Sequence, residues 1–285
     1  MPDVAWLNGR YSPLRAAKVS VMDRGFLYGD GVYEVIRTHG GAPFLLEDHL
    51  ARLESSSGKI ALECPSREVL RRAIAGCLER ARYRESYIYM EMTRGVAFPR
   101  SHAPAPGLKP TVLVAVWRLK ERPSRDFSRG VACITVEDIR WARCDVKSVN
   151  LLPNVMAVTE ARRRGASEAI FVKKGKLVEG GLSAVFVVKR GRLRVPRPGR
   201  NILPSLTRQL VSRTARKMKI PVEERDVSSR QLMAADEVFL ASTTAEGLPV
   251  VRIDGRRIGG GRPGPITIAL RERILSDIYG KDRRG

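Results

Sequence analysis

The sequence has few of the residues from which metal centres and disulfide frameworks are built. It contains 3 histidines and 4 cysteines, and the cysteines (Cys64, Cys77, Cys133 and Cys144) form no C-x-x-C pair. Neither a zinc site nor a set of disulfides is therefore expected. A Walker phosphate loop and an H-E-x-x-H motif are also absent. These absences argue against the motif-bearing classes of metalloenzyme and nucleotide-binding enzyme.

Long apolar runs are missing as well. No stretch approaches the length needed to span a bilayer, and residues 1–6 show no basic region followed by an apolar one. We therefore expect a cytoplasmic protein without a signal peptide or a membrane segment. Hydrophobic and charged residues make up 43% and 29% of the chain, which is ordinary for a globular protein, and 285 residues are enough for two domains.

The charge is unbalanced, because 52 lysines and arginines against 30 acidic residues give a net charge of +22. Such an excess makes nucleic-acid binding one interpretation. The arginines are dispersed, however, and clusters such as 162–164 fall on predicted helices, where they are interpreted as solvated faces. We favour a milder consequence, the attraction of anionic substrates and phosphate cofactors. A non-catalytic, basic nucleic-acid-binding protein remains the alternative from another class.

The pattern of elements predicts two mixed α/β domains, at residues 1–119 and 127–285, joined by a polar, proline-containing linker at 120–126. Asn8-Gly9 predicts a tight hairpin, and apolar residues at helical spacing predict a helix over 69–81. Further strands are expected at 33–37, 43–46, 87–93, 111–117, 131–137, 169–172, 185–188 and 237–240, with a late hairpin at 250–258. Further helices are expected at 48–59, 155–164, 206–218 and 266–278.

One lysine and one later glutamate stand out by their positions. Lys147 lies between a β-like run, 131–136, and a helix-like run, 155–164, and Glu179 follows 32 residues after it. An amine that forms a Schiff base and a carboxylate that holds a pyridinium nitrogen are the two groups that a pyridoxal phosphate enzyme must supply. Spacing alone leaves the ordinary interpretations open, a solvated lysine and a turn glutamate beside Gly180-Gly181.

Several ordered segments resemble the fold-type IV pyridoxal phosphate enzymes, which are the class IV aminotransferases. The segments are 23–34, 47–53, 145–152, 179–180, 202–208 and 242–246. Their shared order along nearly the whole chain is far more specific than any one of them. The resemblance implies an α/β (α+β) fold with a small N-terminal α/β domain and a larger C-terminal domain that has a β-barrel-like core. It also implies pyridoxal 5'-phosphate as cofactor and an active site that lies between the domains and is completed across a homodimer.

Within that family the chain is most similar to the D-amino acid aminotransferases, through residues 141–148, 93–95 and 99–102. In this subgroup the residues that match Tyr33, Arg100 and His102 bind the substrate α-carboxylate, and the neighbouring subunit supplies the Arg-x-His loop. The chemistry agrees, since a guanidinium holds a carboxylate with two parallel hydrogen bonds. The resemblance therefore implies transamination of a D-amino acid, such as D-alanine, with a 2-oxo acid.

The remaining roles follow from the same resemblance, residue by residue. Lys147 matches the Schiff-base lysine and proton shuttle, and Glu179 matches the partner of the pyridine nitrogen. The phosphate contacts are matched by Arg52, Leu206, Thr207 and Thr243, with Leu206 and Thr207 at a helix start, where an anion is favoured. Each residue alone has a structural interpretation, such as a solvated Arg52 or a helix-capping Thr207; the ordered set favours function.

Three positions depart from the family pattern. Leu182 and Ala184 stand in a run that is usually polar, and Ser205 stands where glycine usually precedes the phosphate-binding pair. These departures affect the surroundings of the cofactor rather than Lys147. Two other activities on the same scaffold stay open, a branched-chain L-amino acid aminotransferase and an aminodeoxychorismate lyase, and Arg100-Ser101-His102 argues against both.

Overall fold

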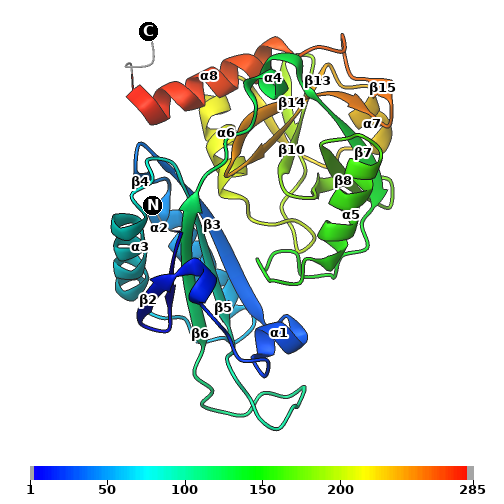
Figure 1. Ribbon diagram of the computed structural model, residues 1–285. Coiled ribbons are helices and arrows are strands. Elements are labelled where there is room, and N and C mark those ends of the chain that lie inside the picture. The colour runs from blue at the N-terminus through cyan, green and yellow to red at the C-terminus, as the bar shows by residue number, and fades with distance from the viewer. Residues whose placement is uncertain (1–2, 281–285) are drawn as a thin grey trace. The chain divides into compact units, whose positions relative to one another are not determined.

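The computed structural model describes residues 3–280, and the chain divides by its internal contacts into two compact units (Figure 1). The first unit extends to Lys120 and also includes Val146–Asn150, whereas the second comprises Glu121–Asp145 and the chain from Leu151 onward. The domain bounds predicted from the sequence, 1–119 and 127–285, remain a prediction. Helix α4 (Ser124–Arg129) begins inside the predicted linker, residues 120–126.

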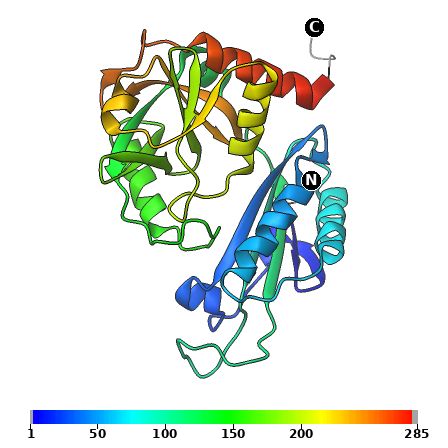
Figure 2. The same ribbon diagram turned by 180° about the vertical axis from the view of Figure 1, so that it is seen from behind.

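The first unit is built on an antiparallel sheet with the strand order β2-β1-β6-β5-β3-β4. Its strands are β1 (Val4–Leu7), β2 (Arg10–Pro13), β3 (Gly31–His39), β4 (Ala42–Pro43), β5 (Ser86–Thr93) and β6 (Thr111–Arg118). Its helices are η1 (Leu14–Ala16), α1 (Arg24–Tyr28), α2 (Leu46–Gly58) and α3 (Arg67–Ala81). Helices α2 and α3 cover one face of this sheet, as both views show (Figures 1 and 2).

Local sequence explains two features of the first unit. Asn8 and Gly9 both have positive φ, at 49° and 93°, which is the conformation of a type I′ hairpin turn, and Leu7 pairs with Arg10 across it. Helix α3 places a stripe of apolar residues in the core, because residues three and four apart share one helical face. The buried members of this stripe are Leu70, Ala73, Ile74, Cys77 and Ala81. Both predictions are confirmed.

The second unit contains a larger sheet with the order β12-β11-β10-β13-β14-β7-β8-β9, to which β15 adds beside β14. Its strands are β7 (Val131–Glu137), β8 (Glu168–Lys173), β9 (Lys176–Gly180), β10 (Ala184–Lys189), β11 (Arg192–Val195), β12 (Val222–Glu224), β13 (Glu237–Ser242), β14 (Ala245–Ile253) and β15 (Arg256–Arg257). Besides α4, its helices are α5 (Leu152–Arg163), α6 (Leu206–Lys217), α7 (Ser229–Met233) and α8 (Pro265–Tyr279).

The larger sheet curls round, so that β9 at its edge also contacts β10 in its interior. Strand β10 is buried on both faces: Val185 and Val187 join one apolar core, whereas Phe186 and Val188 join another. The second of these cores lies under α6 and α8, and α5 covers a third beside β8. This curled half-barrel is the β-barrel-like core that the resemblance implies.

The predicted helices appear within three residues of their expected bounds, and each predicted strand has a counterpart. One strand prediction is largely wrong, because 43–46 forms only the end of the short β4. Leu45 has a φ of 54° and Leu46 begins α2, so the apolar run turns from strand to helix. Among residues 3–280, no helix combines the length and apolarity needed to cross a bilayer.

Candidate active site

Lys147 is attached to the edge of the first sheet by backbone hydrogen bonds. The N–H of Tyr33 on β3 donates to the Lys147 carbonyl (2.9 Å), and the N–H of Val149 donates to the Gly31 carbonyl (3.2 Å). The Lys147 N–H donates in turn to Ser56 Oγ on α2 (3.2 Å). The half-buried side chain places Nζ 4.2 Å from the centroid of the Tyr33 ring. Lys147 and Tyr33, two of the predicted site residues, therefore lie together.

On the opposite side of β3, Glu34 forms the centre of a buried ionic cluster. Its two carboxylate oxygens accept hydrogen bonds from Nε and Nη2 of Arg52, at 2.6 and 2.8 Å. His49 Nδ1 lies 2.7 Å from Glu34 Oε2. The Glu34 side chain is fully buried and that of Arg52 is 9% exposed. Arg52, predicted to bind phosphate, is thus fixed in orientation by Glu34, which was not predicted.

The charges in this cluster follow from its burial. Burial acts to raise the pKa of the Glu34 carboxyl, but the charge and hydrogen bonds of Arg52, with a hydrogen bond from His49, lower it to about 2. Burial lowers the pKa of the His49 imidazole, although Glu34 opposes this. At neutral pH, Glu34 is therefore an anion and His49 is neutral, so His49 Nδ1–H donates to the carboxylate.

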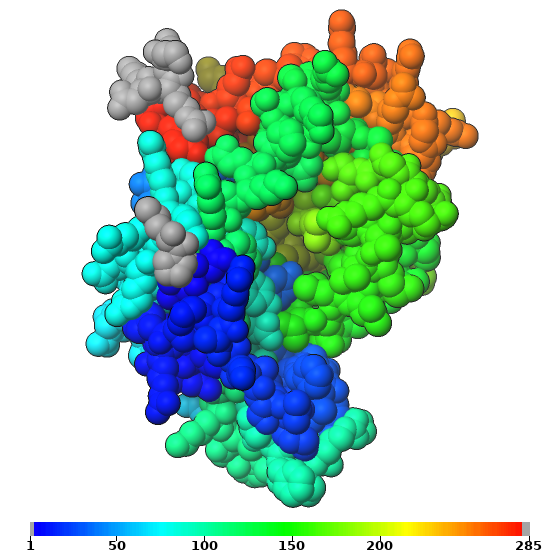
Figure 3. Space-filling model, in the orientation of Figure 1, coloured from blue at the N-terminus to red at the C-terminus, as the bar shows by residue number. Residues whose placement is uncertain are grey.

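Arg100 and His102 lie on the loop that joins β5 to β6, and both side chains are exposed. In Figures 1 and 2 this loop leaves the end of the first sheet beside α1, and Figure 3 shows it at the surface of the first unit. The Tyr28 ring centroid lies 4.8 Å from the Arg100 guanidinium carbon and 5.3 Å from the centroid of the His102 ring. Two of the three predicted carboxylate-binding residues thus contact one aromatic side chain.

Glu179 lies on β9 in the second unit, within the strand rather than at a turn, and is 7% exposed. Its Oε1 accepts a hydrogen bond of 2.5 Å from Arg140 Nη1, and the N–H of Leu203 donates to Oε2 (3.2 Å). The Nε and Nη2 atoms of Arg140 bind Asp138 at 2.9 and 3.0 Å. Burial opposes the charge on Arg140, but the two carboxylates raise its pKa. The guanidinium therefore stays charged and faces Glu179.

The predicted phosphate contacts of the second unit lie at the start of α6 and in a turn. Ser205 is the N-cap of α6, and its side chain accepts a hydrogen bond from the Arg208 N–H (3.1 Å). Leu206 and Thr207 occupy the first turn, whose N–H groups have no acceptor within the helix. Thr243 lies in the turn between β13 and β14. Serine thus fills the glycine position of the family as an ordinary helix cap.

The segment after Glu179 is held by a buried carboxylate. Glu168 Oε1 accepts hydrogen bonds from the N–H of Leu182 (2.9 Å) and from Ser183 Oγ (2.6 Å). Burial raises the pKa of the Glu168 carboxyl, although these donors act against it. The Leu182 side chain is 65% exposed, whereas Ala184 is buried at the start of β10. Glu168 therefore fixes the backbone at Leu182, one of the departures from the family pattern.

Sequence reasoning missed the residues that hold the predicted side chains in place. Glu34, His49 and Arg140 had no separate signal, because the contacts of Glu34 with His49 and Arg52, and of Arg140 with Glu179, join residues 15 to 39 positions apart. Glu34 did fall within one of the segments that carry the family resemblance. The available signal for Glu34 was its place in the strand at 32–36, between mostly apolar neighbours. A charged residue in such a strand is buried only when it has a partner of opposite charge, so the pattern indicates a buried ion pair.

The donors described above are those that pyridoxal phosphate requires. The first unit supplies a primary amine on Lys147 and a guanidinium on Arg52. The second supplies the Glu179 carboxyl group, paired with Arg140, and a helix N-terminus of the kind that binds phosphate. Among the described residues, no group of three or more histidines, cysteines or acidic residues is placed to hold a metal ion. The residues present fit this cofactor.

Comparison with known sequences agrees with this chemistry. The sequence pattern of the family described as amino-transferase class IV matches residues 31–253. The chain is 39% identical over 275 residues to a protein named D-alanine aminotransferase from Bacillus licheniformis, covering 95% of this chain and 96% of that one. It is also 39% identical over 278 residues to the D-alanine aminotransferase of Listeria innocua, covering 95% of each.

Comparison with solved structures gives the fold. The branched-chain amino acid aminotransferase of Escherichia coli matches with a TM-score of 0.91 at 27% identity, covering 100% of this chain and 98% of that one. The branched-chain aminotransferase of the thermophilic archaeon Thermoproteus uzoniensis, solved with norvaline, matches with a TM-score of 0.87 at 32% identity, covering 98% and 96%. From its sequence, its fold and its donor groups, the chain belongs to the class IV aminotransferases and is a pyridoxal phosphate-dependent aminotransferase of fold type IV.

Proposed function

We propose that this enzyme transfers the amino group of a D-amino acid, such as D-alanine, to a 2-oxo acid. The observation that carries the proposal is the 39% identity, over 95% of the chain, to two proteins named D-alanine aminotransferase. The exposed pair Arg100 and His102 supports it, because a guanidinium and an imidazole on one loop suit an α-carboxylate. The amino donor leaves as its 2-oxo acid, and the second oxo acid leaves as an amino acid.

In this proposal pyridoxal 5'-phosphate is held by the residues that match the family pattern. Lys147 would hold the cofactor through its primary amine, and Glu179 would lie at the ring nitrogen. Arg52, the Leu206 and Thr207 N–H groups and the Thr243 hydroxyl would hold the phosphate. When bound, the cofactor supplies an electron sink for the substrate α-carbon.

The protein's own contribution is to orient the substrate and to move one proton. Tyr33, Arg100 and His102 bind the α-carboxylate and so fix the direction of the bond from the α-carbon to hydrogen. Lys147 Nζ would be the group that moves the proton of the substrate α-carbon. Lys147 contacts the Tyr33 ring. The residue proposed to move the proton and one residue proposed to bind the carboxylate therefore lie side by side.

We also propose that the active form is a homodimer. Helix α5 exposes Leu152, Val155 and Met156, which recur at helical spacing, with 69%, 57% and 54% of their surface accessible. A stripe of this kind is typical of a surface that a partner covers. Diluting the protein to monomers is expected to remove activity if the Arg100 loop acts in the partner's site; full activity in a monomer would exclude that arrangement.

A branched-chain L-amino acid aminotransferase is the second candidate. The two solved structures named above, with TM-scores of 0.91 and 0.87, are branched-chain aminotransferases, so the fold accommodates that activity equally well. Fold alone does not fix the substrate. The two candidate functions differ in the configuration, D or L, of the amino acid that the enzyme accepts.

The deciding experiment records the visible absorbance of the protein loaded with pyridoxal phosphate before and after addition of D-alanine or, separately, L-leucine. A decrease with D-alanine only supports the proposal. A decrease with L-leucine only assigns the branched-chain activity, and a cofactor that responds to neither points to a lyase.

A lysine variant tests the proposed chemistry on the protein side. Lys147→Ala is expected to abolish transamination and to remove the visible absorbance of the covalently held cofactor, whereas Lys18→Ala, at an exposed lysine, leaves both unchanged. Substantial turnover by Lys147→Ala would overturn the role of this lysine.

A further inference from the structure

The loop that carries Arg100 and His102 is anchored to the segment around α1. At the base of the loop, the N–H of Arg24 donates to the Gly95 carbonyl (2.9 Å) and the N–H of Ala97 donates to the Met22 carbonyl (3.3 Å). These two bonds fix the point at which the loop leaves β5. They do not reach Arg100 or His102, whose backbone needs a separate support.

Arg24 supplies that support through its side chain, which is only 4% exposed although the residue lies at the start of a short helix. Its Nη1 donates to the Ser101 carbonyl (2.5 Å) and its Nη2 donates to the His102 carbonyl (2.8 Å). Its Nε donates to Asp30 Oδ2 (2.8 Å), which fixes the plane of the guanidinium. Each of the three nitrogens thus has its own acceptor, a geometry that the single ammonium of lysine does not reproduce.

The same loop rests on Tyr28. The guanidinium carbons of Arg24 and Arg100 lie 4.7 and 4.8 Å from the centroid of the Tyr28 ring, and the His102 ring is 5.3 Å from it. Arg24 therefore binds the loop backbone while Tyr28 contacts the two exposed side chains. With its carbonyls held, the loop presents a guanidinium and an imidazole in one arrangement.

We propose that Arg24 is a positioning residue for the carboxylate-binding loop, acting through its hydrogen bonds to the Ser101 and His102 carbonyls. The proposal rests on the proposed function, in which Arg100 and His102 bind the α-carboxylate. A free loop loses conformational freedom each time it binds an anion, so a loop held in advance binds more tightly. The ligand class is the α-carboxylate that amino acids and 2-oxo acids share.

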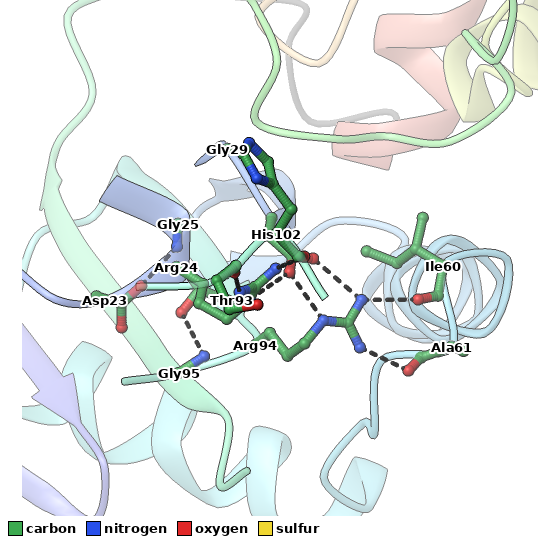
Figure 4. A network of polar contacts seen from close by, with 12 residues as sticks. Asp23, Arg24, Gly25, Gly29, Ile60, Ala61, Thr93, Arg94, Gly95 and His102 are labelled. Carbon is green, nitrogen blue, oxygen red and sulfur yellow. Dashed lines mark hydrogen bonds and ion pairs between the residues drawn. The ribbon is translucent and has the colours of Figure 1, made fainter. Parts of the chain in front are cut away.

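Arg94 offers a matched control within the same network (Figure 4). It also binds Asp30, through Nε (2.8 Å) and Nη2 (3.0 Å). Its other contacts are the backbone carbonyls of Ala61 and Ile60, both at 2.8 Å, which follow the end of α2. Arg24 and Arg94 are thus two arginines with one shared carboxylate and two carbonyls each, and of the two only Arg24 binds the Ser101 and His102 carbonyls.

The experiment compares Arg24→Lys and Arg94→Lys in the holoenzyme by hydrogen exchange and by kinetics. Arg24→Lys is expected to speed amide exchange in the loop, residues 96–108, and to raise KM for both the amino acid and the oxo acid about tenfold, with kcat changing less. Arg94→Lys is expected to lower the melting temperature while leaving loop exchange and KM within about twofold of the unaltered enzyme. Unchanged loop exchange in Arg24→Lys would overturn the proposal.

A double-variant cycle tests whether Arg24 acts through the loop. If it does, Arg24→Lys adds little to the KM of an Arg100→Ala, His102→Ala enzyme, whereas independent action would multiply the two effects. Should Arg24→Lys not fold, Arg24→Gln serves in the same comparison. D-alanine turnover by the unaltered enzyme tests the proposed function separately, since the exchange readout does not depend on which amino acid reacts.

Discussion

Arg140 and Glu179 are joined by a hydrogen bond of 2.5 Å, and the same guanidinium binds Asp138 through two further nitrogens. One cation thus serves two carboxylates in a region where the Arg140 and Glu179 side chains are 7% and 10% exposed. Glu179 is thereby held in place by a cation on one oxygen and by the Leu203 N–H on the other. In the proposed function, Arg140 is therefore a residue that positions Glu179.

Replacing Arg140 is expected to damage both stability and cofactor electronics. Arg140→Gln leaves two buried carboxylates without their cation, which costs about 3–5 kcal/mol of unfolding free energy. It also removes the cation that faces Glu179, so the visible spectrum of the loaded protein is expected to change. Arg143→Gln, which breaks a more exposed pair with Asp145, is the control and should change little. Equal melting temperatures for the two variants would contradict this account.

Glu34 is expected to make the first unit sensitive to acid. Its folded pKa of about 2 lies below the usual carboxyl value, so the stabilisation is complete above about pH 4.5 and is lost as the pH falls toward 2. Glu34→Gln should therefore unfold with a smaller dependence on pH in that window, and at pH 7 it should be less stable by about 3 kcal/mol. Denaturant unfolding from about pH 2.5 to pH 7 measures both effects.

Glu160 provides the control for Glu34. The pKa of its carboxyl is also lowered to about 2, by hydrogen bonds from Arg163 and Arg164, but this cluster lies on the outer surface of α5. Solvent screens such pairs, so Glu160→Gln should have little effect on stability. If the stability of Glu34→Gln depended on pH in the same way as that of Glu160→Gln, burial of the ion pair would not be the cause of the effect.

Glu168 is expected to have the opposite dependence on pH. Burial raises the pKa of its carboxyl above the unfolded value, so its favourable contribution is complete below about pH 4.5 and declines as the pH rises through the folded pKa. Glu168→Gln keeps an oxygen acceptor for Leu182 and Ser183 and cannot ionise. The variant should therefore lose less stability than the unaltered protein as the pH rises above about 4.5, as thermal unfolding at increasing pH will show.

Ser205 permits a test of the α6 terminus. Ser205→Ala removes the cap on the Arg208 N–H and should cost about 1 kcal/mol, whereas Ser205→Gly should cost only a few tenths. If the first turn of α6 binds the cofactor's phosphate, Ser205→Ala should also weaken cofactor affinity. Ser228→Ala removes the cap of α7 and is the control, expected to lower stability alone. Equal cofactor affinity in all three variants would show that the first turn of α6 does not bind the phosphate.

The sequence predicted elements whose causes are local. Asn8-Gly9 determines its turn because the positive φ angles needed there suit those residues, and the α3 stripe repeats at helical spacing. Strand β9, which carries Glu179, was missed because Lys176–Gly180 is short and ends in a glycine-rich segment. The resemblance still identified Glu179 as a site residue, although the local pattern favoured a turn.

The supporting residues could not be predicted for a different reason. The role of Arg24 depends on the carbonyls of residues 77 and 78 positions away, which only the fold brings to its side chain. The role of Arg140 likewise depends on the fold, because β9 places Glu179 beside it. Charged residues of this kind resemble solvated ones in sequence, and the high arginine content hides them further. Their burial in the fold is what distinguishes them.

The excursion of Val146–Asn150 into the first unit means that the chain crosses between units three times. A cut after Lys120 therefore does not yield two self-sufficient halves, because the N-terminal fragment lacks the segment that bonds to β3 and the C-terminal fragment carries it without a docking edge. In the proposed function, reassembly must return Lys147 to its place beside β3 before the enzyme can act. Two fragments split after Lys120 should therefore be inactive when each is expressed alone. They should regain activity when fused to a pair of proteins that bind each other and bring the fragments together.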